Sequence, residues 1–460
     1  MPLALRPPIQ LVVALIAVVS AGIAPAAAQH LEPLDPGPLK GAWLVPDDAP
    51  RTHVELVVLA GERDNDGPRG LAHYTEHLVW LSATRPASGA TRPDTGGAHS
   101  NAATTSRATH YYLDGPPERL DAMLASLART LRPVDLPEAF MREEVGIVRG
   151  EFERGVRESP WSSLWRDLGR MQHGRQWPAR SVIGTPETMA RFTPDAALRF
   201  HRRTHRPGNA VLVVKGPHGP DAAARAVAAA FPAHGAGAGR GRLGDASDER
   251  PDGGPLAPPA YRARAAGRVV EERIEPRLGA PELMQSRLIE LEDPPPFHDL
   301  AARQALLHDA LDSTRAGGLA GPLRYDAFIA ERYELSFEIL DERRVEMTFS
   351  ARPDRGVTLA ELHDAFEATL AASAARGLPS ESVELVRSRA LAELDALERP
   401  ANAVLDGALA SIASGATPIP LADWRRRLAA VEPADVNALL RAFADASRTA
   451  TLLVSTGNDR

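Results

Sequence analysis

The chain has 460 residues, of which 44% are hydrophobic and 25% are charged, and these proportions exclude a collagen-like, wholly disordered or coiled-coil protein. It contains no Cys, so it has no disulfide, no thiolate zinc site and no Cys nucleophile, and any metal site must use His and carboxylate ligands. The net charge of −7 argues against a nucleic-acid partner.

The first 28 residues have the pattern of a secretory signal peptide. Arg6 provides a short positive segment, residues 11–23 are an apolar run, and residues 26–28 are a small-residue cleavage site. The apolar run is short for a bilayer span, which needs about 20 residues, although an uncleaved membrane anchor stays an alternative. We therefore expect cleavage near Ala28, a periplasmic or secreted bacterial protein, and no membrane span in the mature chain.

Predicted strands and helices follow each other along both halves of the chain. The predicted strands are residues 54–60, 109–113, 209–214, 345–350 and 449–454. The predicted helices are residues 70–80, 120–130 and 141–154, segments that open at Asp135, Pro194 and Pro433, and residues 359–374 and 380–397. This mixture is typical of an α+β fold.

A segment rich in Gly and Pro, residues 233–259, divides the chain and is a predicted linker, because its composition cannot bury a core. No strand leads into it and no helix follows it, so its glycines do not form a phosphate loop. A helix that opens at Pro194 before a strand recurs 239 positions later at Pro433. We therefore predict two related α+β domains, residues 29–232 and 260–460, each with a mixed sheet covered by helices.

The most informative motif of the sequence lies in residues 70–80. On a helix, His73 and His77 lie one turn apart, so both imidazoles project from one face and can hold one Zn²⁺. Glu76 lies on the same face, where it can reach a water on the metal without ligating the metal. This HxxEH motif is the zinc-protease motif in inverse order. It predicts a catalytic zinc site in which Glu76 is the general base.

A catalytic zinc needs a third protein ligand. Glu144 and Glu151 lie seven residues apart on a predicted helix, so they share a face, and one could ligate while the other orients a His. The spacing does not say which residue does which, and a solvated helix face is the alternative for either one. His201 and His205 repeat the His spacing, but they enclose cationic residues and no Glu, so we expect that pair to be structural.

With these motifs, the chain resembles the pitrilysin/insulinase/mitochondrial-processing-peptidase family of inverzincin metallopeptidases. Residues 70–77 match the family's zinc helix, and residues 144–151 match its downstream motif, in which the second Glu is the third ligand. The resemblance therefore implies that Glu151 ligates the metal, that Glu144 supports the site, and that each chain binds one Zn²⁺.

Residues 96–111 are similar to the family's GGxxNAxT…TxY strand pair. By resemblance, Asn101 and Ala102 lie on an edge strand that pairs with the substrate backbone. The family's second domain also carries an Arg and a Tyr about seven residues apart that reach into the active site. Arg324 and Tyr333 are the best matches, although they are nine residues apart. Arg332 and Tyr325 compete for these roles, and an exposed Arg with a packed Tyr is the structural alternative.

Together these features predict a zinc metalloendopeptidase that hydrolyses peptides or unfolded segments. By resemblance, its two domains form half of a clamshell, and the chain works as a homodimer or as a heterodimer with a homologous subunit. One alternative is a non-catalytic or partner-dependent subunit that acts as a peptide-binding or assembly module. Another is a metal-dependent hydrolase of a different substrate class. The intact zinc motif favours the catalytic interpretation.

Overall fold

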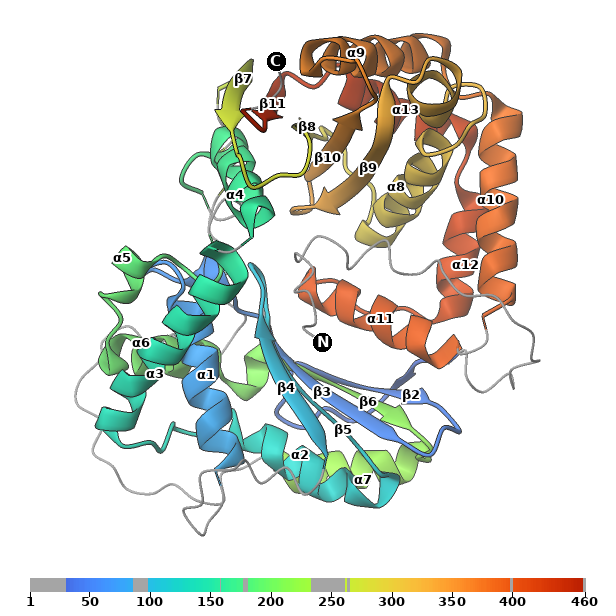
Figure 1. Ribbon diagram of the computed structural model, residues 1–460. Coiled ribbons are helices and arrows are strands. Elements are labelled where there is room, and N and C mark those ends of the chain that lie inside the picture. Colours follow the sequence, from blue (N-terminus) through green and yellow to red (C-terminus); the bar gives the residue numbers. More distant parts are fainter. Residues whose placement is uncertain are drawn as a thin grey trace.

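The computed structural model describes residues 30–85, 98–157, 159–176, 181–232, 261–262, 265–397 and 400–457. The predicted signal peptide, the predicted linker, and Gly96 and Gly97 of the strand-pair motif lie outside the described residues. Two lobes are visible, each with its own sheet and helices (Figure 1). Within the described ranges, no helix has both the length and the apolar character that a membrane span requires.

The first lobe is built on a six-stranded mixed sheet in the order β1-β2-β6-β3-β5-β4. Only β2 and β6 run parallel, and the other neighbours are antiparallel. The strands are β1 (Glu32–Pro33), β2 (Gly41–Pro46), β3 (Thr52–Val58), β4 (His99–Thr104), β5 (Thr109–Gly115) and β6 (Ala210–Gly216). The helices are α1 (Leu71–Thr84), α2 (Leu120–Arg129), α3 (Glu138–Phe152), α4 (Pro160–His173), α5 (Pro186–Met189), α6 (Pro194–Thr204) and α7 (Pro220–Ala230), with short 3-10 helices η3 (Glu62–Asp64), η4 (Pro117–Arg119) and η7 (Pro207–Asn209) and a π-helix η5 (Glu153–Arg157).

The second lobe repeats this arrangement around a five-stranded sheet in the order β7-β11-β8-β10-β9. The strands are β7 (Gly267–Ile274), β8 (Glu282–Glu290), β9 (Ala330–Ile339), β10 (Arg344–Pro353) and β11 (Arg448–Ser455). The helices are α8 (Phe297–Leu311), α9 (Leu359–Arg376), α10 (Ser380–Asp395), α11 (Pro400–Ala413), α12 (Leu421–Ala430) and α13 (Pro433–Ala444), with the short π-helix η8 (Gly321–Asp326).

The two lobes have the same topology. The strands β2-β6-β3-β5-β4 of the first sheet correspond in order to β7-β11-β8-β10-β9 of the second sheet. In each described sheet the single parallel pair, β2 with β6 or β7 with β11, lies at the corresponding position. The helix that opens at Pro194 and the one that opens at Pro433 are α6 and α13. The prediction of two related α+β domains is therefore confirmed.

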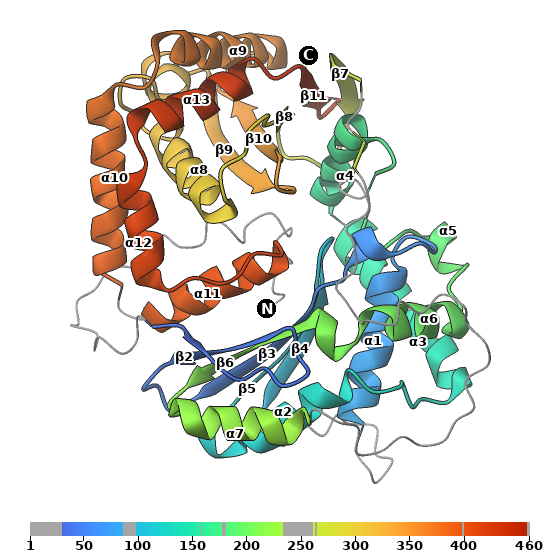
Figure 2. The same cartoon turned by 180° about the vertical axis from the view of Figure 1, so that it is seen from behind.

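One helix of each lobe packs against the sheet of the other lobe, as both views show (Figure 2). α4 packs on β8 and β11 through Leu164 and Leu168. α11 packs on β2, β3 and β6, where Val404 joins the apolar cluster that contains Val57. Exchanged helices make the two lobes share apolar surface, so neither lobe completes its core alone. We call the face of the first sheet that carries Val57 and α11 the inner face.

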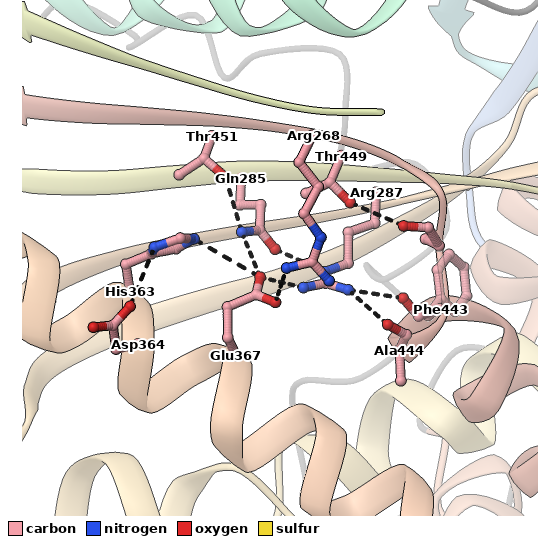
Figure 3. A network of polar contacts seen from close by, with 11 residues as sticks. Arg268, Gln285, Arg287, His363, Asp364, Glu367, Phe443, Ala444, Thr449 and Thr451 are labelled. Atoms are coloured by element: carbon pink, nitrogen blue, oxygen red, sulfur yellow. Dashed lines mark hydrogen bonds and ion pairs between the residues drawn. The ribbon is translucent and has the colours of Figure 1, made fainter. Parts of the chain in front are cut away.

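A buried charged network lies between the second sheet and helices α9 and α13 (Figure 3). The side chain of Arg287 is 1% exposed, and its guanidinium contacts the carboxylate of Glu367. It also donates to Gln285 at 2.7 Å and to two main-chain carbonyls at the end of α13 at 3.0 and 3.2 Å. Glu367 accepts further hydrogen bonds from Gln285 and Arg268, each at 2.9 Å. These contacts offset the free-energy cost of burying the charged guanidinium of Arg287.

Candidate metal centre

Helix α1 is held in place at its N-terminus and along its side. Gly70 precedes it with φ of +89°, and a Cβ there would collide with the carbonyl of Ile183, so the position requires glycine. The hydroxyl of Tyr74 donates to the carbonyl of Met141 on α3 at 2.5 Å, and its ring stacks on Phe192 at 5.2 Å. These contacts hold α1 against α3, which carries the two candidate glutamates.

The structure brings His73, His77 and Glu151 together. Their ligand atoms all lie within 4.8 Å of one another. Nε2 of His73 is 3.7 Å from Oε2 of Glu151, and Nε2 of His77 is 3.4 Å from the same oxygen. Bonds of about 2.1 Å at tetrahedral angles place ligand atoms roughly 3.4 Å apart, so small side-chain movements would suit Zn²⁺.

Glu144 lies on the other edge of the His77 ring. Its Oε1 accepts from Nδ1 of His77 at 2.8 Å, and Glu144 itself is buried. A carboxylate that holds Nδ1–H leaves the lone pair of Nε2 free for a metal. The two glutamates therefore lie where the family resemblance expects them, with Glu151 among the ligand atoms and Glu144 behind His77.

The charges of this cluster fit a divalent cation. Burial and the charge of His77 lower the pKa of His73 to about 4, so its ring is neutral and has a lone pair to share. Burial also lowers the pKa of His77, but hydrogen bonds to Glu144 and Glu151 outweigh burial and raise it to about 10. The carboxylates thus favour a positive charge beside the two Nε2 atoms. A bound divalent cation would supply that charge.

Glu76 lies beside the ligand set without belonging to it. One of its oxygens is 4.0 Å from Nε2 of His73, and the same oxygen accepts a hydrogen bond from Oγ1 of Thr104 at 3.0 Å. Burial raises the pKa of Glu76 to about 7. A carboxyl group with such a pKa can both accept and release a proton near neutral pH. Thr104 belongs to the strand-pair motif of the sequence, but its contact with Glu76 depends on the fold and has no local sequence signal.

Strand β4 is the free edge of the first sheet, because it pairs with β5 and ends the strand order. Asn101 is exposed on this strand, and the next residue, Ala102, is half-buried. The outer backbone groups of an edge strand are open to pairing with another chain. The structure thus places both predicted substrate-binding residues on an available edge, next to the strand end where Thr104 holds Glu76.

The structure does not bring Arg324 and Tyr333 to the metal cluster within this chain. Arg324 lies over the ring of Tyr325, with its guanidinium carbon 5.4 Å from the centroid. Tyr333 stacks on Phe349 at 5.6 Å and so faces the core of the second lobe, where burial raises its pKa. In the described ranges, no hydrogen bond or ion pair links either residue to His73, His77 or Glu151. Their role in the site stays a prediction.

The second His pair has internal partners. Nε2 of His201 bonds the carbonyl of Thr130 at 2.9 Å, and Nε2 of His205 bonds the hydroxyl of Tyr111 at 2.8 Å. Burial lowers the pKa of both rings, so both are neutral at pH 7. These contacts agree with a structural role.

Comparisons with known proteins point to one family. The model of the insulinase family, peptidase family M16, matches residues 44–168. An uncharacterized zinc protease of Streptomyces coelicolor is 32% identical over 222 residues, which cover 45% of this chain and 44% of that relative. The chain spans less than half the length of the curated relatives that it matches.

Solved structures share the fold over nearly all of the chain. An M16-like peptidase from Alicyclobacillus acidocaldarius aligns with a TM-score of 0.74 at 18% identity and covers 93% of this chain and 98% of its own. The periplasmic protease PqqL from Escherichia coli aligns with a TM-score of 0.70 at 14% identity, over 95% of this chain and 48% of its own. The family model over residues 44–168 and the shared half-clamshell fold together make the chain similar to the pitrilysin/insulinase family, peptidase family M16.

Proposed function

We propose that this chain is a zinc-dependent metalloendopeptidase that hydrolyses peptide bonds in peptides or unfolded segments. The observation that carries the proposal is the convergence of His73, His77 and Glu151, with Glu76 beside them. Two imidazoles and one carboxylate are a typical catalytic zinc set, because they leave one position for water or substrate. The names of several relatives, which call them zinc proteases, support the same chemistry.

Different residues of the chain perform different steps of the proposed hydrolysis. Bound Zn²⁺ would polarise the scissile carbonyl and make a water at the site more acidic. Glu76 takes a proton from the attacking water and later gives it to the departing amine. Thr104 holds Glu76 in position from β4, and Glu144 holds His77. The backbone of β4 around Asn101 and Ala102 binds the substrate as an added strand.

We propose that the working unit is a homodimer, or a heterodimer with a homologous subunit. The chain aligns over 95% of its length with only 48% of PqqL, so a second half of similar size would complete that architecture. An Arg and a Tyr from the second subunit could then reach the site that Arg324 and Tyr333 do not reach within this chain. The predicted signal peptide supports a location in the periplasm or outside the cell, with domains 29–232 and 260–460 in the mature protein.

The test begins with metal analysis of purified residues 29–460. We expect about one Zn²⁺ per chain. A chelator should abolish hydrolysis of a peptide library, and added Zn²⁺ should restore it. Hydrolysis that survives complete removal of metal would contradict the proposal. So would a fully zinc-loaded chain that cleaves no peptide, alone or with a homologous partner, and that result would favour the peptide-binding subunit.

A further inference from the structure

Four side chains on the inner face of the first sheet form a hydrogen-bonded row outside the metal centre. Nδ1 of His110 lies 2.7 Å from one oxygen of Glu55, and the other oxygen of Glu55 lies 3.0 Å from Nε2 of His53. Nδ1 of His53 lies 3.0 Å from Asp114. The row therefore starts at Asp114, which is 32% exposed, and ends at the nearly buried His110. The end at His110 lies within electrostatic range of Glu76.

The two carboxylates determine where the protons of this row lie. Burial opposes charge on both His53 and Glu55, but their mutual hydrogen bonds and those to Asp114 and His110 prevail. They raise the pKa of His53 to about 9 and lower that of Glu55 to about 2. Glu55 is thus an anion that only accepts, and His110 carries its proton on Nδ1. In the neutral ring, Nε2 of His110 is then an acceptor.

Nε2 of His110 has no hydrogen-bond partner in the ranges that the structure describes, and 11% of the side chain is exposed. The strand register shows where this acceptor lies. His110 is paired with Val57 on β3 and with Ala103 on β4, and directly opposed residues share a sheet face. Along this line of paired residues, only the small and exposed side chain of Ala103 lies between His110 and the free edge of the sheet. The next residue along β4 is Thr104, which holds Glu76.

We propose that His110 is a specificity-determining residue that accepts a hydrogen bond from a lysine or arginine side chain of the bound peptide. The inference rests on the proposed function, because it requires a peptide strand paired with β4. Such a strand would lie about 9–10 Å from the backbone of β5, so only a long side chain can cross Ala103 and reach Nε2. A cationic side chain suits the position, because the anion Glu55 lies directly behind the His110 ring.

Glu55 and His53 are positioning residues in this arrangement. Glu55 holds the ring of His110 by Nδ1, and His53 holds Glu55 by its second oxygen. The ring of His53 also stacks on Tyr112 at 5.7 Å, which restricts its rotation. We expect the loss of either residue to weaken the preference for basic side chains without removing metal.

The experiment compares peptides that carry a single lysine, or a norleucine, which is lysine without its ammonium group, at each position in turn. Binding is measured on the zinc-loaded Glu76→Gln chain, and kcat/KM is measured on the chain with Glu76. At one position next to the cleaved bond, lysine should be preferred by about 10- to 100-fold, as for a hydrogen bond to a charged group. His110→Leu should abolish that preference in both assays and leave the norleucine peptide and the zinc content unchanged.

Three further variants separate recognition from folding. His110→Gln keeps an acceptor and should retain part of the preference, while Glu55→Gln should give an intermediate loss. His99→Leu removes an exposed imidazole from the far end of β4 and should keep the full preference. Equal losses for the lysine and norleucine peptides in His110→Leu would overturn the inference, as would binding without any preference. Failure of the proposed function is a separate result, namely normal binding preference with no turnover by the zinc-loaded chain.

Discussion

Glu144 accepts a hydrogen bond at 2.8 Å from Nδ1 of His77, on the edge of the ring that faces away from the ligand cluster. Nε2 of the same ring lies 3.4 Å from Glu151. One glutamate thus lies where it can orient the imidazole, while the other lies among the atoms of the proposed ligand set. This relationship separates two carboxylates that the spacing of the sequence leaves equivalent.

The first prediction concerns this pair. Glu151→Ala should lose metal and activity together, because it removes a ligand oxygen. Glu144→Ala should weaken zinc affinity by about 10–100-fold and recover activity at saturating zinc. Competition with a chromophoric chelator measures the affinities. Glu143→Ala, on the exposed side of the same helix, is the control and should change neither quantity. If Glu144→Ala strips the metal while Glu151→Ala keeps it, the two roles are reversed.

The second prediction tests Glu76 as the base. Glu76→Gln should retain zinc and the fold but lose about 10²- to 10⁴-fold in turnover, because an amide can hydrogen-bond the water but cannot take its proton. Peptide turnover and bound zinc are measured on the same preparation. Thr104→Val removes only the hydroxyl that holds Glu76, so we expect a smaller loss with normal zinc content. Near-normal turnover of Glu76→Gln would remove Glu76 as the base.

The grouping of the candidate metal residues could be predicted because local geometry decides it. His73, Glu76 and His77 lie within five residues on one helix, so the helical repeat alone aligns them. The duplicated lobes were also predictable, since a helix and strand of similar pattern recur at Pro194 and Pro433. Predicted and observed ends differ by up to four residues, as for the strand predicted over 54–60 and found over 52–58 and the helix predicted over 70–80 and found over 71–84.

Features that depend on distant pairing could not be predicted in this way. The apolar faces of α4 and α11 are visible in sequence, but nothing local indicates that each packs on the sheet of the other lobe. Arg287 lies on a strand buried on both faces, where a sequence pattern predicts apolar residues. The row from Asp114 to His110 requires the register of β3 against β5, which hydrophobic alternation alone does not specify.

The third prediction asks which chain supplies the Arg and the Tyr. If this chain supplies them to a partner in a homodimer, Arg324→Ala and Tyr333→Phe should each lower turnover without changing zinc content. Mixing each mutant with Glu76→Gln subunits should restore part of the activity, because one site per dimer then has all of its groups. Full activity of both mutants, together with a requirement for a co-purifying homologue, would assign the pair to that homologue.

The fourth prediction concerns the buried network of the second lobe. Glu367→Ala leaves the guanidinium of Arg287 buried without its carboxylate, and we expect a loss of about 3–5 kcal/mol in the free energy of unfolding. Urea denaturation followed by circular dichroism measures it. Arg268 is a partner of the same carboxylate but is 57% exposed, so Arg268→Ala is the control and should cost less than about 1 kcal/mol. Equal effects of the two changes would contradict the importance of burial.

The fifth prediction is a pH dependence of stability from His53. Burial lowers the pKa of this ring, but hydrogen bonds to Asp114 and Glu55 raise it overall from 6.5 to about 9. A group whose pKa is raised on folding stabilises the fold fully below its unfolded pKa and loses that contribution as pH rises through its folded pKa. The contribution of the imidazolium should therefore be complete near pH 6 and should decline between about pH 6.5 and 9.

The partner carboxylate does not mask this effect, because hydrogen bonds to His110 and His53 lower the pKa of Glu55 to about 2 despite burial. Glu55 stays ionised across the whole interval, so its contribution is constant there. The measurement compares urea unfolding of the chain with that of His53→Gln, whose side chain cannot titrate, at steps from pH 6 to pH 9.5. The difference in unfolding free energy should be about 2–3 kcal/mol at pH 6 and should shrink steadily as pH rises. A difference that does not change with pH would mean that His53 is neutral in the row, and that Glu55 and Asp114 are held without its charge.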